Sequence, residues 1–321
     1  PNTLKESDIN TPIEDQHVEH FAENLVENYD EKLEKELDSS YIQDVTQKAA
    51  DADAEVTREL RRAGINENIG NINAVNELLA TGELMAYTRA LKGKGIGNAD
   101  KSVHNHADKN NSSKAAYIDS SEKLSDVLSG REKLEALYTN LEEAAGDELE
   151  EAIESSLTDT DETPVDYDTF EELRISNRQI RYISNLARKN DYRIPYVKNG
   201  KAGLINLTFL SDSSDKGKIS IKMDTEAYGE LSMEAKITGK DISLFVKQNS
   251  NTVHPDDRSI YKSFEELENV LKLQHGMNSV RINTVRVPDV NYVTYENSGA
   301  SVPADELYRI AQSVTGVFFG K

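Results

Sequence analysis

The chain has 321 residues, of which 37% are hydrophobic and 30% charged, and its formal net charge is −21 at pH 7. It contains no cysteine, which excludes a disulfide framework and thiolate chemistry at zinc or redox sites. No apolar run approaches the roughly 20 residues that a membrane-spanning helix requires, so we expect no membrane insertion.

The charge is distributed unevenly along the chain. Residues 1–172 carry a net charge of −25, whereas residues 173–321 carry +4. This asymmetry predicts two regions with different roles, and the acidic first half would repel phosphate groups. We therefore expect no nucleic-acid partner, and we interpret Tyr182, Tyr192 and Tyr196 as core or interface residues rather than a base-stacking platform.

Residues 1–91 have the pattern of an acidic helical region. Their apolar residues recur at three- and four-residue spacing, which predicts narrow apolar stripes on charged helices. Within 54–91 we predict a compact three-helix unit, because Gly64 follows a basic helical turn and Asn71 or Asn73 can cap a second helix.

The next two segments separate this region from the rest. Residues 92–117 are rich in Gly, Asn, Ser and Lys with scarcely any apolar residue, which predicts a flexible linker. Residues 118–166 are predicted to be an acidic helical segment, which like charges and Pro164 bring to an end.

Residues 167–321 have a different character and indicate an α+β domain. A helix or helix pair is predicted at 167–190, with Asn177 able to cap its second part, and a last helix should start at Pro303 and end before Gly316. We thus expect an α+β fold with an acidic, mainly helical N-terminal half and a C-terminal mixed or antiparallel sheet covered by helices. The predicted strands are 193–197, 204–210, 219–223, 231–237, 242–246, 279–287 and 290–295, with a helix at 260–273.

The strands at 219–223, 231–237 and 242–246 alternate apolar and polar residues. We expect one face of their sheet to be buried and the other to face water. Gly239, at the first central position between the last two strands, fits a two-residue type II′ hairpin. The helix at 260–273 has an apolar face that can cover the buried side.

The connection between the first two of these strands is the most distinctive stretch. Its sequence, MDTEAYGELSM, has a strand end, a short turn in which Gly229 supplies an unusual backbone angle, and an alternating strand. This pattern resembles the C-terminal domain of flagellar hook-length control proteins over residues 200–290, although Thr225 and Tyr228 stand where that family has Pro and Leu. The matching positions are Met223, Thr225, Tyr228, Gly229, Leu231 and Met233.

The rest of the chain is similar to an uncharacterised clostridial family whose small helical units contain an Asn-Ile motif, here 68–69 or 71–72.

The resemblance to hook-length control proteins implies a non-enzymatic protein without cofactors. Proteins of that family are exported by the flagellar type III apparatus, and their C-terminal domain contacts the export gate to switch substrate class. The resemblance also implies that the six matching positions bind a flagellar export gate or hook component. It further implies that the chain is cytoplasmic before export.

Two other function classes stay open. The chain could be a structural or adaptor protein whose N-terminal helices, within 1–91, bind a protein partner while the C-terminal domain serves as scaffold. The strand–turn–strand pattern would then be an ordinary fold element, because a fold does not fix a function. A hydrolase would require carboxyl groups with strongly raised pKa values in a pocket, and no acidic residue is distinguished in this way by the sequence.

Several short stretches have the residue types of metal or phosphate sites but lack the full pattern. The first histidine pair has Glu14 on the same side of its helix but lacks the HExxH spacing, and the second pair has no third ligand fixed nearby. One glycine-rich stretch lacks the spacing of a phosphate loop, and an acidic stretch has Pro where a calcium loop needs Gly. We interpret all of them as solvated loops or helix faces and expect no metal. They are His17 with His20, His104 with His106 and Asp108, residues 92–97, and residues 159–164.

Overall fold

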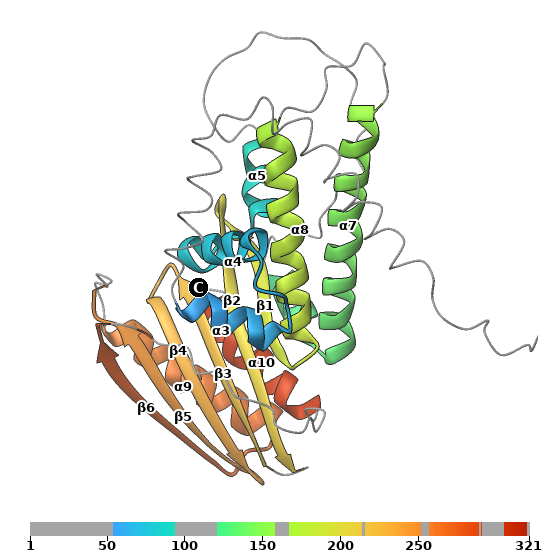
Figure 1. The fold of residues 1–321 in the computed structure, drawn as a ribbon. Helices are drawn as coiled ribbons and strands as arrows, with labels where there is room; N and C mark the ends of the chain where they lie inside the picture. Colours follow the sequence, from blue (N-terminus) through green and yellow to red (C-terminus); the bar gives the residue numbers. More distant parts are fainter. Residues whose placement is uncertain are drawn as a thin grey trace, which may run out of the picture. The chain divides into compact units, whose positions relative to one another are not determined.

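A computed structural model describes residues 54–93, 121–157, 167–213, 216–251, 257–288, 290 and 305–319. These residues form an α+β fold in which a six-stranded sheet is combined with helices, as the sequence predicts (Figure 1). The described helices are α3 (Ala54–Ala63), α4 (Ile69–Thr81), α5 (Met85–Gly93), α6 (Ser121–Val127), α7 (Arg131–Leu157), α8 (Tyr167–Ala187), α9 (Asp257–Gln274) and α10 (Asp305–Phe319).

The strands follow one another across the sheet in chain order, β1-β2-β3-β4-β5-β6. Neighbours are antiparallel from β1 to β5, whereas β6 runs parallel to β5 after the crossover through α9. This arrangement is a mixed sheet, and it leaves β1 and β6 as the two outer strands. The strands are β1 (Asp191–Lys198), β2 (Lys201–Ser213), β3 (Lys216–Thr225), β4 (Gly229–Thr238), β5 (Asp241–Asn249) and β6 (Ser279–Val287).

Two-residue turns set the register of two hairpins. Asn199 and Gly200 join β1 to β2 with φ values of 51° and 76°, the pattern of a type I′ turn. Gly239, between β4 and β5, has a φ of 57°, while Lys240 has no positive φ. This pattern confirms the predicted type II′ hairpin.

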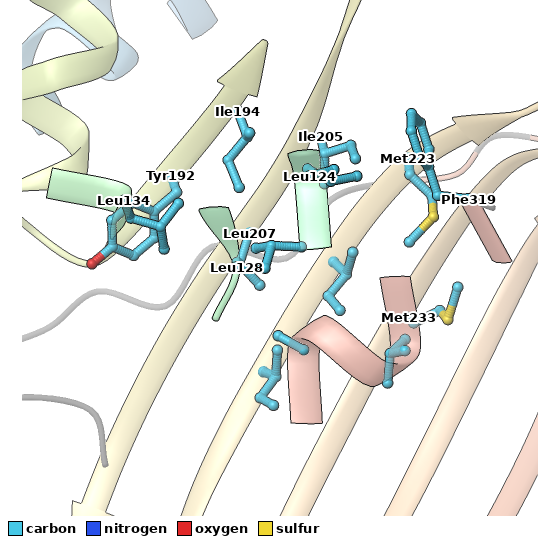
Figure 2. Packing of buried hydrophobic residues seen from close by; sticks show 14 of the residues in the cluster. Leu124, Leu128, Leu134, Tyr192, Ile194, Ile205, Leu207, Met223, Met233 and Phe319 are labelled. Carbon is cyan, nitrogen blue, oxygen red and sulfur yellow. The ribbon is translucent and has the colours of Figure 1, made fainter. Parts of the chain in front are cut away.

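One face of the sheet forms the main hydrophobic core. Tyr192, Leu207, Ile221, Met233 and Val246 lie in register across β1 to β5, and each is at most 2% exposed. α10 packs against β3, α9 and α6, and α9 also packs against β6. The helix at 260–273 therefore shares the cover with α10, and Figure 2 shows side chains of this cluster from β1 to β4, α6 and α10.

The end of α10 differs from the prediction, because the helix passes Gly316 and continues to Phe319. Val317, Phe318 and Phe319 are buried, and the Lys198 Nζ donates a hydrogen bond to the Phe319 carbonyl at 2.7 Å. Apolar burial and a cation at the C-terminal carbonyls both stabilise the last turn, which outweighs the low helix propensity of one glycine.

Two predicted helix caps are wrong. Asn68, rather than Asn71 or Asn73, caps α4, and its side-chain oxygen accepts the Asn71 N–H at 2.8 Å. Asn177 lies inside the continuous helix α8, so the alternative of a helix pair at 167–190 is also wrong. α8 packs against α3, α4, α5 and α7, and these tertiary contacts override the local preference of asparagine for a cap.

A buried amide connects α8 to the helices before it in the chain. Gln179 is 0% exposed, accepts the Met85 N–H at 2.8 Å and donates to the Ala74 carbonyl at 3.1 Å. Both ends of the amide are thus satisfied inside the core, as burial of a polar group requires. Through this side chain α4 and the start of α5 are held to the same helix that leads into the sheet.

The second face of the sheet is not uniformly wet, in contrast to the prediction. Ser220 and Ser232 are 0% exposed on that face, and neither hydroxyl has a hydrogen-bond partner. In the register Ser220 lies opposite Glu234 and Ser232 lies opposite Lys222, so longer side chains stand beside both serines. Long neighbours can cover a small residue with their methylene groups while their charged ends stay in water.

A compact cluster of charges holds α3 to β1 on this second face. The Glu59 Oε2 accepts the Tyr182 hydroxyl at 2.7 Å and lies 3.0 Å from an Arg62 nitrogen and 3.6 Å from an Arg193 nitrogen. Asp191 is hydrogen-bonded to Arg62 as well. Burial raises the pKa of Tyr182, so this hydroxyl stays protonated and donates. Two cations and two carboxylates therefore neutralise one another where α3 meets the sheet.

We predict that Glu59→Ala lowers the free energy of unfolding by about 3 kcal/mol, because it leaves two largely buried guanidinium groups with a single carboxylate. The matched control is Glu55→Ala on the same helix, whose side chain is 59% exposed, and it should cost less than about 0.5 kcal/mol. Urea denaturation of the full chain measures both values. Equal, small effects of the two substitutions would contradict the assigned cluster.

Candidate functional site: the β3–β4 hairpin

The turn that carries the family resemblance is a tight β-hairpin. Thr225 at the end of β3 lies opposite Gly229 at the start of β4, so the turn is made by the three residues between them. Gly229 has a φ of 66°, in the left-handed region that a glycine adopts without strain. The sequence prediction that Gly229 supplies an unusual backbone angle is confirmed.

The Thr225 side chain stabilises the turn from inside. Its hydroxyl accepts the Tyr228 N–H and donates to the Gly229 carbonyl, both at 3.1 Å, and the residue is 5% exposed. A proline at this position could make neither bond, because its ring has no hydroxyl. The departure from the family pattern at Thr225 thus has a structural role in this chain.

Tyr228 attaches the turn to the helices that cover the sheet. Its hydroxyl is 2.7 Å from the Ser263 Oγ on α9, and its ring lies edge-on to Phe318 of α10 with 5.9 Å between centroids. The Tyr228 carbonyl accepts the Gln248 side-chain amide of β5 at 3.2 Å. Three elements distant in sequence therefore fix this one residue, which is 3% exposed.

Tyr196 supports the turn from the side of β1. Its hydroxyl donates to the Asp224 carbonyl at 3.4 Å, and its ring lies over Gly203, where a Cβ atom would come within 2.6 Å of the ring. Burial, and to a smaller degree the charges of Asp224 and Glu83, raise the pKa of Tyr196 to about 12. The hydroxyl therefore remains a donor at neutral pH.

The six positions predicted to bind a partner lie in the interior. Met223, Thr225, Tyr228, Leu231 and Met233 are at most 5% exposed. Gly229 is also buried. Five of them place their side chains in the core or in the hydrogen bonds of the turn, so in this structure they shape the hairpin rather than its outer surface.

The outer surface of the hairpin is acidic. Asp224 and Glu226 are exposed and Ala227 is half-buried. The Glu226 carboxylate accepts a hydrogen bond from the Asn199 side chain, which connects this hairpin to the β1–β2 hairpin. The arrangement presents two carboxylates on a backbone that is fixed at several points.

A third carboxylate, Glu230, lies just behind the tip. Burial alone would raise its pKa, but hydrogen bonds from Lys222 at 2.6 Å and from the Asn249 side chain at 2.9 Å outweigh burial, so the pKa is lowered. Glu230 is therefore ionised at neutral pH and neutralised by its own lysine. We find no proton-transfer role for it in this geometry.

Sequence reasoning missed the residues that hold the hairpin from outside. These residues come from α9, β5, β1 and the β1–β2 turn, and nothing near Thr225 in sequence points to them. They are Ser263, Gln248, Tyr196 and Asn199. One signal was available, since Asn199-Gly200 is the strongest short-range marker of a hairpin and it identifies β1 and β2 as neighbours.

Other predicted sites fall mainly outside the part of the chain that the structure describes. This holds for both histidine pairs, for the acidic stretch at 159–164, for the strand at 290–295 except its first residue and for most of the linker at 92–117. Within the described ranges, no group of three or more metal-ligating side chains occurs. Among the same residues, no helix is long and apolar enough to cross a membrane.

Comparison with known proteins finds no family model, no curated protein and no solved structure that matches the chain.

We predict that Thr225→Val lowers the free energy of unfolding by about 1–3 kcal/mol, because it keeps the shape of the side chain but leaves the buried Tyr228 N–H without an acceptor. Thr238→Val, at an exposed position of β4, is the matched control and should change stability by less than about 0.5 kcal/mol. Thermal and urea denaturation test the difference. A neutral Thr225→Val variant would show that the hydroxyl does not stabilise the turn.

Proposed function

We propose that the chain is a non-enzymatic protein similar to flagellar hook-length control proteins, and that it acts in substrate switching of type III export by binding a protein partner. The proposed partner is the cytoplasmic domain of a flagellar export gate or a hook component. The chain would be cytoplasmic before it is exported through the flagellar apparatus. No cofactor enters this proposal.

The observation that supports the proposal best is the construction of the β3–β4 hairpin. Hydrogen bonds hold the hairpin to β1, β5 and α9 and a ring contact holds it to α10, while the side chains of Asp224 and Glu226 remain on the surface. A surface that is already rigid loses little conformational freedom on binding, which favours affinity. We assign direct contact to these two carboxylates, and we assign the positioning of the hairpin to the buried residues that match the family pattern.

The adaptor alternative is favoured by a different observation. Ile69 and Leu79 on α4 are 48% and 39% exposed, so this helix offers two large apolar side chains to a partner. α3, α4 and α5 pack on α8, so a fragment 1–91 would lack the surface on which these helices rest. The alternative is therefore tested on the full chain, with Ile69→Ser and Leu79→Ser.

We predict that the full chain binds the isolated cytoplasmic domain of the export gate, and that Asp224→Lys with Glu226→Lys weakens binding about tenfold or more by reversing the charge of the contact surface. The matched control is Glu143→Lys with Asp147→Lys on α7, two exposed carboxylates whose reversal changes the net charge equally. Calorimetric titration measures the dissociation constant for the unmodified chain, the hairpin variant and the α7 control.

Three results would count against this function. They are no binding by the unmodified chain, equal loss in both charge-reversed variants, or loss in Ile69→Ser with Leu79→Ser while the hairpin variant binds normally. The last result would favour the adaptor alternative. A Gly229→Val variant adds a positioning test, because valine is strained at a φ of 66° and should weaken binding even though Gly229 is buried.

A further inference from the structure

The outer strand β6 offers an open edge of the sheet. It is nine residues long and pairs with β5 on one side, and no other described strand pairs with it. The register with β5 runs without a shift from Ser279 to Val287. A strand of this length and regularity can accept another strand at its free side.

The hydrogen bonds at the two ends of β6 show which backbone groups point outward. The Ser250 N–H donates to the Val287 carbonyl at 2.8 Å, so Val287 faces β5. At the other end the Lys240 carbonyl accepts the Asn278 N–H at 2.8 Å and the Ser279 N–H at 3.5 Å. In a parallel pair, every second residue directs both its N–H and its C=O to the same neighbour. The odd-numbered residues of β6 therefore face β5, and Ile282 and Thr284 direct their backbone groups to the free edge.

Apart from its two arginines, β6 lacks the devices that usually protect an edge strand. It contains no proline and no lysine, and its pairing with β5 has no bulge. Arg281, Asn283, Thr284, Val285 and Arg286 are all exposed. Such an edge is a hazard for self-association unless a specific segment occupies it.

An exposed cation on β6 indicates what that segment carries. Lys236 lies opposite Lys218, and Ser243 lies between Lys236 and Arg281 in the register. Lys236 and Arg281 are exposed and make no ion pair within the described residues. Arg281 is the member of this row that lies on β6, so an acidic side chain on an added strand would stand directly beside it.

Two exposed apolar side chains lie on the same face of the sheet as Arg281. Val285 on β6 is 37% exposed and Phe245 on β5 is 41% exposed. Arg281 and Val285 are on one face of β6, separated by Asn283. A strand added at this edge would place one side chain next to Arg281 and another, four residues away along its length, next to Val285.

We propose that β6 binds an extended segment of a partner protein as a seventh strand, and that this segment has an acidic residue and an apolar residue four positions apart. The backbone groups of Ile282 and Thr284 bond the segment. Arg281 pairs with its carboxylate, and Val285 with Phe245 contacts its apolar side chain. This surface is separate from the β3–β4 hairpin, so either can fail without the other.

The test uses the full chain and a fluorescein-labelled synthetic peptide, rich in threonine and as long as β6, with Glu and Val four positions apart. We predict binding with a dissociation constant on the order of 10–100 µM. Thr284→Pro removes an outward N–H without touching the bonds to β5, and it should weaken binding about tenfold at an unchanged melting temperature. Thr284→Ser is the matched control and should bind as the unmodified chain does.

A charge-reversal variant and hydrogen exchange of the backbone amides complete the test. Arg281→Glu should abolish binding of the acidic peptide and permit binding of its Lys-for-Glu counterpart. Hydrogen exchange should show the Ile282 and Thr284 amides unprotected in the free chain and protected with peptide. The proposal is overturned by equal binding of Thr284→Pro and Thr284→Ser, by protection of those amides before peptide is added, by dimers that Thr284→Pro abolishes, or by a single-stranded oligonucleotide that displaces the peptide.

Discussion

The packing of α10 on the apolar face of the sheet is the interaction on which the rest of the structure depends. β3 and β4 in the middle of the sheet place their apolar side chains on this face, and the last helix of the chain packs against β3. A hydrogen bond adds to the apolar burial between α10 and the sheet, because the hydroxyls of Tyr192 on β1 and Tyr308 on α10 lie 3.0 Å apart in the core. Without α10 the most apolar surface of the chain would face water.

This cover also buries the inner side of the β3–β4 hairpin. Phe318 packs against Tyr228 and Phe264, so the interior of the β3–β4 hairpin, α9 and α10 form a single packed unit. The hairpin residues that match the hook-length control pattern are buried in that packing. The acidic hairpin tip and the outer edge of β6, which we propose as contact surfaces, lie outside this packed unit.

Local patterns in the sequence predicted much of this fold. Alternation located the strands, and Gly239 identified a turn type, because both depend on neighbours in sequence. The sequence left open whether 167–190 is one helix or two, and it missed the cap at Asn68, although that cap is a local bond from the Asn71 N–H. The end of α10 at Phe319 was missed because it depends on tertiary partners such as Lys198. The buried state of Ser220 was missed for the same reason.

In the candidate site, too, some features followed from the sequence and others required the fold. The position of the turn and the role of Gly229 followed from sequence, whereas its anchoring through Ser263 and Gln248 required the fold. The sequence suggested that Tyr228 marks a weak point of the resemblance. In the structure its hydroxyl and ring join the turn to both covering helices, which a leucine could not do through a hydrogen bond.

The absence of tryptophan from the chain permits a direct measurement of the cover. Phe318→Trp introduces a single indole between Tyr228 and Phe264, at a position that is 0% exposed, while Tyr261→Trp introduces one on the outer side of α9, at a position that is 54% exposed. Quenching by iodide in the folded chain should be weak for Phe318→Trp and strong for Tyr261→Trp. Equally strong quenching of both, in variants that melt cooperatively, would contradict the packing of α10 on the sheet.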